Sequence, residues 1–153
     1  MTELILASVA IGIFIIYNIV MFCLFGMPAS LSNTYYYLNN RWPGSGWAFT
    51  LMMMVVSGLL VYPWIHVSYQ ISDWSHYLGF LPFMACSMLI FVSIAPNFRT
   101  EKGIEAVHMW CAKLSAVFAL VWVAVACWKI AYIIPLWIGL CWLIAWLTKT
   151  MKS

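Results

Sequence analysis

The stretch LILASVAIGIFIIYNIVMFCLF, residues 4–25, decides the fold because no charged residue interrupts it. A hydrocarbon layer about 30 Å thick needs about 20 helical residues to cross it, and this stretch meets that length. A secretory signal has an apolar core of roughly 7–15 residues behind a basic start. This stretch follows Glu3 instead of a cation. We therefore expect a first membrane-spanning helix that is retained in the chain.

The composition of the whole chain indicates the same environment. Hydrophobic residues make up 66% of the chain and charged residues 7%, whereas a soluble domain has about 25% charged residues. We expect an all-α polytopic membrane bundle that forms a single domain over residues 1–153. The apolar blocks predict about five transmembrane helices, at residues 4–25, 47–66, 77–95, 107–128 and 131–148.

The last two predicted spans are separated only by Lys129 and Ile130. A single helix over residues 107–148 would be about 63 Å long at about 1.5 Å per residue. That length is about twice the thickness of the hydrocarbon layer. We therefore expect the chain to turn back at Lys129, and four spans with a re-entrant end are the alternative.

The charges predict how the chain is threaded. The net charge is +3, and most cations lie in loops or the C-terminal tail, which indicates an orientation signal and no nucleic-acid partner. If the N-terminus is outside and the C-terminus cytoplasmic, five loop or tail cations are inside and only Lys129 is outside. The inner cations are Arg41, Arg99, Lys102, Lys149 and Lys152. We therefore expect an integral protein of the cytoplasmic (inner) membrane with this orientation.

Aromatic residues gather where the predicted spans end. One group is Tyr35, Tyr36, Tyr37, Trp42 and Trp47, and the other is Tyr62, Trp64, Tyr69, Trp74 and Tyr77. Because Trp and Tyr prefer the headgroup level, the two groups predict an aromatic belt. The first group includes a loop that is expected to hold a short interfacial helix, capped by Ser30 or Ser32 and ended by Pro43, Gly44 and Gly46.

Lys113 is the one charge that falls inside a predicted span. It is expected either to extend to the headgroups and bind an anionic lipid, or to pair internally with a polar group such as Asn18 or Ser87. Small residues on the same helix predict close packing, and hence a central place for the fourth span. These small residues are Ala112, Ser115, Ala116, Ala119 and Ala126. The residues expected to contact a lipid or a partner are Lys113, Arg99, Lys102 and His108.

The positions of the three histidines bear on two kinds of site, a haem site and a metal site. Two axial histidines would suggest a haem between helices, but His108 is predicted at the opposite membrane face from His66 and His76. We therefore expect no cofactor. His66, Asp73 and His76 can be interpreted as an outer-face metal cluster with an open position, as in catalytic zinc sites, or as a polar loop near the headgroups.

Two segments are similar to a known family. Asn97-Phe98-Arg99, followed by His108, Ala112 and Phe118, resembles the corresponding stretch of the DRAM-like (damage-regulated autophagy modulator) membrane proteins and their bacterial relatives. The segment at residues 28–32 is similar to the serine-containing loop of that family. The resemblance implies a small lipid-facing membrane bundle, with six spans where the apolar blocks of this chain predict five. It transfers no catalytic residue.

The sequence therefore predicts a non-enzymatic membrane protein that associates with lipids or a partner. One alternative is a metal-dependent lipid hydrolase that uses the cluster of His66, Asp73 and His76. The other alternative is a channel or holin-like pore formed by a homo-oligomer, because one chain of this length is small for a transporter.

Overall fold

The computed structural model describes residues 1–153 except 29, 72–77, 99–102 and 131–153. The regular elements of the described residues are all helical, with no strand among them. They are α1 (Thr2–Phe25), α2 (Asn33–Arg41), α3 (Trp47–Ile71), α5 (Phe80–Ile94), the 3₁₀ helix η1 (Ala95–Phe98) and α6 (Ile104–Ile130). The predicted helical bundle is confirmed. Three segments, Thr2–Phe25, Trp47–Ile71 and Glu105–Ala126, are long and apolar enough to cross a membrane.

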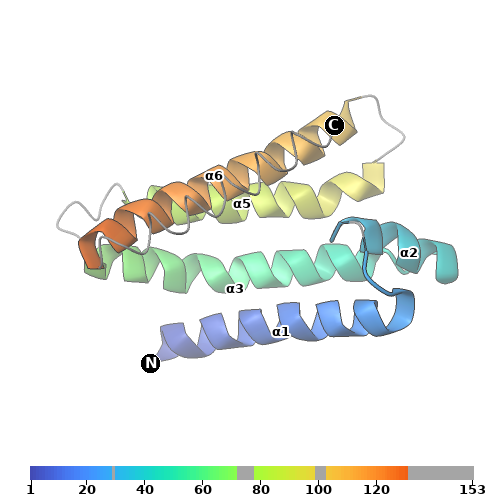
Figure 1. Ribbon diagram of the computed structural model, residues 1–153, viewed down its shortest axis with the longest axis horizontal. Helices are drawn as coiled ribbons and strands as arrows, with labels where there is room; N and C mark the ends of the chain where they lie inside the picture. Colours follow the sequence, from blue (N-terminus) through green and yellow to red (C-terminus); the bar gives the residue numbers. More distant parts are fainter. Residues whose placement is uncertain (29, 72–77, 99–102, 131–153) are drawn as a thin grey trace.

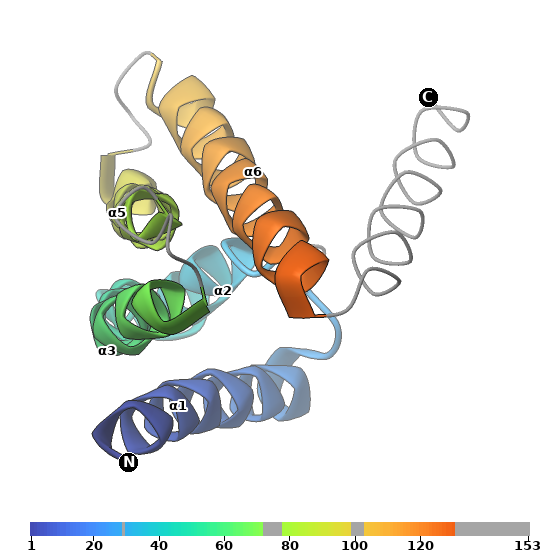
Figure 2. The same ribbon diagram turned by 90° about the vertical axis from the view of Figure 1, so that its left-hand side faces the viewer.

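The long helices run alternately up and down, and each packs against its neighbour in the chain. Among the described elements α1 packs on α3, α3 on α5, and α5 on α6 (Figures 1 and 2). The short α2 lies at the end of the bundle where α1 and α5 finish and where α3 and α6 begin, here called the α2 end (Figure 1). At the opposite end α1 begins and α3 and α6 finish.

The helix boundaries differ from the predicted spans in ways that proline and polar residues explain. The second predicted span, residues 47–66, continues to Ile71. The third, residues 77–95, is an α-helix only from Phe80 to Ile94, after which η1 follows. Pro96 has no N–H to donate to the carbonyl four residues earlier, so the α-helical pattern stops there. The fourth span lies within α6, and the fifth, residues 131–148, lies outside the described residues.

The short helix α2 has the predicted start and end. The Ser30 hydroxyl accepts a hydrogen bond from the first backbone N–H of α2 at 3.3 Å, whereas Ser32 makes no side-chain cap. The turn after α2 contains Gly44 with φ +86°, a conformation that favours glycine. The N–H of Gly44 donates to Asn39 Oδ1 at 2.8 Å.

The buried core lies between α1, α3 and α5. It is formed by Ala10, Phe49, Met52, Met53, Val56 and Val92. The described part of α6 is mostly exposed: Ser115 and Ala126 are buried, but Ala112 is exposed. Among the described elements α3 and α5 each pack between two helices, whereas α6 packs mainly on α5. The fifth predicted span lies outside the described residues, so the central place expected for the fourth span stays a prediction.

Candidate functional site

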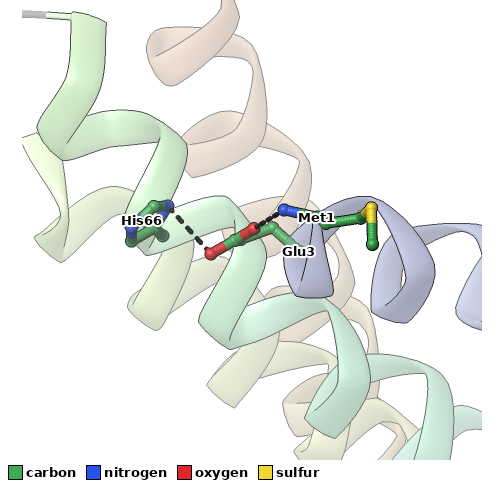
Figure 3. A network of polar contacts seen from close by, with 3 residues as sticks. All are labelled: Met1, Glu3 and His66. Atoms are coloured by element: carbon green, nitrogen blue, oxygen red, sulfur yellow. Dashed lines mark hydrogen bonds and ion pairs between the residues drawn. The ribbon is translucent and has the colours of Figure 1, made fainter.

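His66 of the predicted metal cluster contacts a carboxylate of another helix. Its Nδ1 lies 3.5 Å from Glu3 Oε1 of α1, and Glu3 Oε2 accepts a hydrogen bond from the amino group of Met1 at 3.0 Å (Figure 3). Asp73 and His76 lie outside the described residues. Among the residues that are described, no group of three or more His, Cys, Asp or Glu side chains is placed to hold a metal ion.

His108 joins α6 to α5 instead of standing in solvent. It is partly buried, and its Nδ1 lies 3.2 Å from the carbonyl oxygen of Val92. In a regular helix that carbonyl would accept from residue 96, but Pro96 has no N–H. A carbonyl can only accept, so His108 Nδ1 carries the proton and donates it. The histidine thus satisfies a carbonyl that the proline leaves without its helical donor.

A second hydrogen bond joins the same two helices further along. The buried hydroxyl of Ser115 donates to the carbonyl of Ala85 at 2.9 Å. With the bond from His108, it places the α2 end of α6 firmly on α5. Arg99 and Lys102, which were predicted with His108 to contact a lipid or a partner, lie outside the described residues.

A polar cavity of about 150 Å³ lies at the α2 end beside His108. Its polar side chains come from two elements that are far apart in the sequence, α2 with the turn before it, and the first turns of α6. The lining residues are Ser32, Asn33, Tyr36, Ala95, Pro96, Glu105 and His108. Gly103, with φ +93°, directly precedes α6. Its carbonyl accepts a hydrogen bond from the N–H of Val107, which fixes the first turn of α6, where Glu105 lies.

Lys113 is exposed on α6, where its ammonium nitrogen lies 5.3 Å from the centre of the Trp110 ring. Asn18 and Ser87, the predicted internal partners of Lys113, each donate a hydrogen bond to a carbonyl of their own helix. Asn18 donates to the carbonyl of Phe14 at 2.7 Å, and Ser87 donates to the carbonyl of Phe83 at 2.8 Å. The geometry therefore favours the interpretation in which Lys113 extends along the outside of α6.

An apolar groove of about 400 Å³ lies at the opposite end, between α1, α3 and α6. One of its walls is Trp122 of α6, whose indole N–H donates to the Ser68 hydroxyl at 2.7 Å. The Trp122 ring also meets the Trp64 ring edge to face, with centroids 5.4 Å apart. The remaining lining is Met1, Glu3, Leu4, Ala7, Leu60, Pro63, Trp64 and Val67.

The sequence contained a signal for the polar cavity that spacing alone did not reveal. Pro96 follows an apolar helix and removes one donor, which implies that the Val92 carbonyl needs a partner from elsewhere. His108 is the polar residue that supplies it. The sequence does not show that α2 lines this cavity, because that depends on where α2 lies relative to α6.

Comparisons with known proteins give no match, either to a protein family, to a curated protein or to a solved structure. The resemblance to the DRAM-like family stays a prediction that rests on its short motifs.

Proposed function

We propose that the protein is a non-catalytic integral membrane protein that associates with anionic lipid through Lys113. The observation that carries the proposal is the exposed cation beside Trp110 on a helix long and apolar enough to cross a membrane. An ionisable side chain on such a helix is costly unless it meets water, a partner or a headgroup. A lipid phosphate at the interface provides the counter-charge.

The direction of the Lys113 side chain supports this assignment. Lys113 follows Ile104, the first residue of α6, by nine positions, which corresponds to about 14 Å along the helix at about 1.5 Å per residue. Side chains of a helix point towards its N-terminus, and Trp110 lies one turn nearer to the α2 end. The contact with Trp110 therefore holds the ammonium group on the side of the nearer headgroups, where a long lysine stem can reach them.

The aromatic belt predicted from the sequence fits the same proposal. Phe25 at the end of α1 contacts both Tyr37 of α2, with centroids 5.8 Å apart, and Trp42, with centroids 6.3 Å apart. Amphipathic rings at the end of an apolar helix are suited to the headgroup level. Arg41 lies over the Trp42 ring at 5.9 Å, so a second cation–aromatic pair is available at the α2 end.

The lipid that copurifies with the protein tests this proposal. We expect Lys113→Ala to lower the ratio of anionic to zwitterionic lipid by about fivefold, because one cation near a membrane surface contributes about 1 kcal/mol. Lys113→Arg keeps the charge and is the matched control, with a ratio close to that of the unsubstituted protein. Both variants are purified from the same membranes, and the bound lipid is measured by mass spectrometry. An unchanged ratio in Lys113→Ala would overturn the proposal.

We further propose that the α2 end faces the cytoplasm and the opposite end faces outward. Arg41 lies at the α2 end, and Arg99 and Lys102 fall in the sequence between the end of η1 and the start of α6, which are both at that end. Lys129 lies in the last turn of α6 at the other end, so the excess of cations favours the α2 end as the cytoplasmic one. Asn40 and Gln70 are exposed residues at the two ends. A membrane-impermeant maleimide applied to intact cells is expected to label Gln70→Cys but not Asn40→Cys. The unsubstituted chain controls for its native cysteines, and the reverse labelling would refute this orientation.

A further inference from the structure

We propose that the polar cavity at the α2 end binds a primary ammonium group. The group is that of an aminophospholipid headgroup or of a free amine. This inference goes beyond the lipid contact of Lys113, because the cavity involves different side chains and a ligand group of opposite charge.

The first argument is that the cavity presents hydrogen-bond acceptors. His108 donates its Nδ1 proton to Val92, so in the uncharged form of the ring Nε2 is the nitrogen that accepts. The Glu105 carboxylate accepts only. A ligand that bonds to both groups must therefore bring donors, and a primary ammonium group has three.

The second argument is charge. Among the lining residues that the structure describes, Glu105 is the one acidic side chain, and no lysine or arginine is among them. The described residues contain no salt bridge to Glu105; the ion pairs found there both involve Glu3. Ser32, Asn33 and Tyr36 are uncharged and bring further oxygen atoms to the cavity. A cation is thus the complementary ligand.

The third argument is size and selectivity. A cavity of about 150 Å³ is smaller than the roughly 300–1,000 Å³ of sites for drug-sized ligands, so it suits a small headgroup. Quaternary ammonium groups are recognised by cages of aromatic rings, whereas Tyr36 supplies the one benzene-type ring among the lining residues that the structure describes. We therefore expect a preference for phosphatidylethanolamine over phosphatidylcholine, which has no N–H to donate.

The fourth argument is location. The cavity is lined by residues of α2 and of the first turns of α6, and Figure 1 shows that α2 and the start of α6 lie at the same end of the bundle. An interfacial helix at the end of membrane-spanning helices lies among the lipid headgroups. The ammonium group of a neighbouring lipid can therefore reach the cavity while its acyl chains stay beside the apolar helices.

The test is a titration of the full-length protein in detergent with short-chain phosphatidylethanolamine or phosphatidylcholine, followed by native mass spectrometry. We expect phosphatidylethanolamine to bind about tenfold more tightly, and Glu105→Gln to remove this difference, because a hydrogen bond to a charged group is lost. Equal binding of the two lipids, or an unchanged preference in Glu105→Gln, would overturn the proposal. Competition by free ethanolamine would identify a soluble amine as a ligand, and retention of the lipid would identify the lipid headgroup.

Three further variants separate binding from folding. His108→Asn keeps a donor close to the position of Nδ1 but removes Nε2, so it is expected to weaken phosphatidylethanolamine binding with an unchanged melting temperature. Asn33→Asp adds a second carboxylate and is expected to tighten binding, which a misfolded variant would not do. Lys113→Ala should leave the headgroup preference unchanged. Loss of anionic lipid in that variant therefore reports on the proposed function independently of this cavity.

Discussion

Phe49→Ala is expected to lower the free energy of unfolding by about 3 kcal/mol, the lower end of the range for Phe→Ala substitutions in soluble cores. Phe49 is 1% exposed and belongs to the cluster that joins α1, α3 and α5. In a bilayer the loss is mainly one of packing, because lipid chains are as apolar as the protein interior. Phe49 is the one aromatic residue among the six buried members of this core, and Tyr17 and Tyr35 pack against its edge as partly buried residues.

The measurement is unfolding in mixed micelles with increasing sodium dodecyl sulfate, followed by circular dichroism. Phe91→Ala is the matched control, because Phe91 lies on α5 but is 55% exposed. We expect this variant to change the free energy of unfolding by less than about 0.5 kcal/mol, as is usual for surface positions. Similar effects of the two substitutions would contradict the packing of α3 between α1 and α5.

The helices could be predicted from the sequence because their signal is local. An uninterrupted apolar run of about 20 residues is readable without any knowledge of its neighbours. The ends were less predictable because polar residues do not by themselves stop a helix. The polar residue Ser68 lies beyond the predicted end of the second span, yet its hydroxyl donates to the carbonyl of Trp64, so α3 continues past it.

The candidate sites were harder to predict because they depend on contacts between distant segments. His66 was interpreted as a ligand of a loop cluster, but its partner in the described structure is Glu3 at the start of α1. In the sequence Glu3 only precedes the first predicted span, and nothing there indicates a contact with His66. His108 was placed correctly at the start of a helix, yet its role depends on the helix that α6 packs against.

A hydrogen bond from Trp122 links α6 to α3 at the end opposite α2. The indole N–H donates to the hydroxyl of Ser68, which is fully buried and in turn donates to the carbonyl of Trp64. The edge-to-face contact of the two indole rings lies beside these bonds. Because α3 and α6 otherwise touch little, the contact between these two helices depends mainly on the Trp122 side chain.

Trp122→Ala is therefore expected to lower the free energy of unfolding by about 3 kcal/mol, through the lost ring and the cavity left behind. Trp122→Phe keeps an aromatic ring but removes the N–H, and its expected cost is about 0.6 kcal/mol, the average for hydrogen bonds between membrane helices, and no more than about 1.7 kcal/mol. A double-mutant cycle of Trp122→Phe with Ser68→Ala isolates that bond. Both variants are unfolded in mixed micelles of sodium dodecyl sulfate.

The coupling between the two sites decides whether this link exists. If Trp122 donates to Ser68, the double variant should lose less stability than the sum of the two single variants, because the second substitution has no bond left to break. Strictly additive effects would show that α6 does not rest on α3 through this bond. The apolar groove would then lack the fixed wall that Trp122 gives it, since Trp64 and Trp122 line it together.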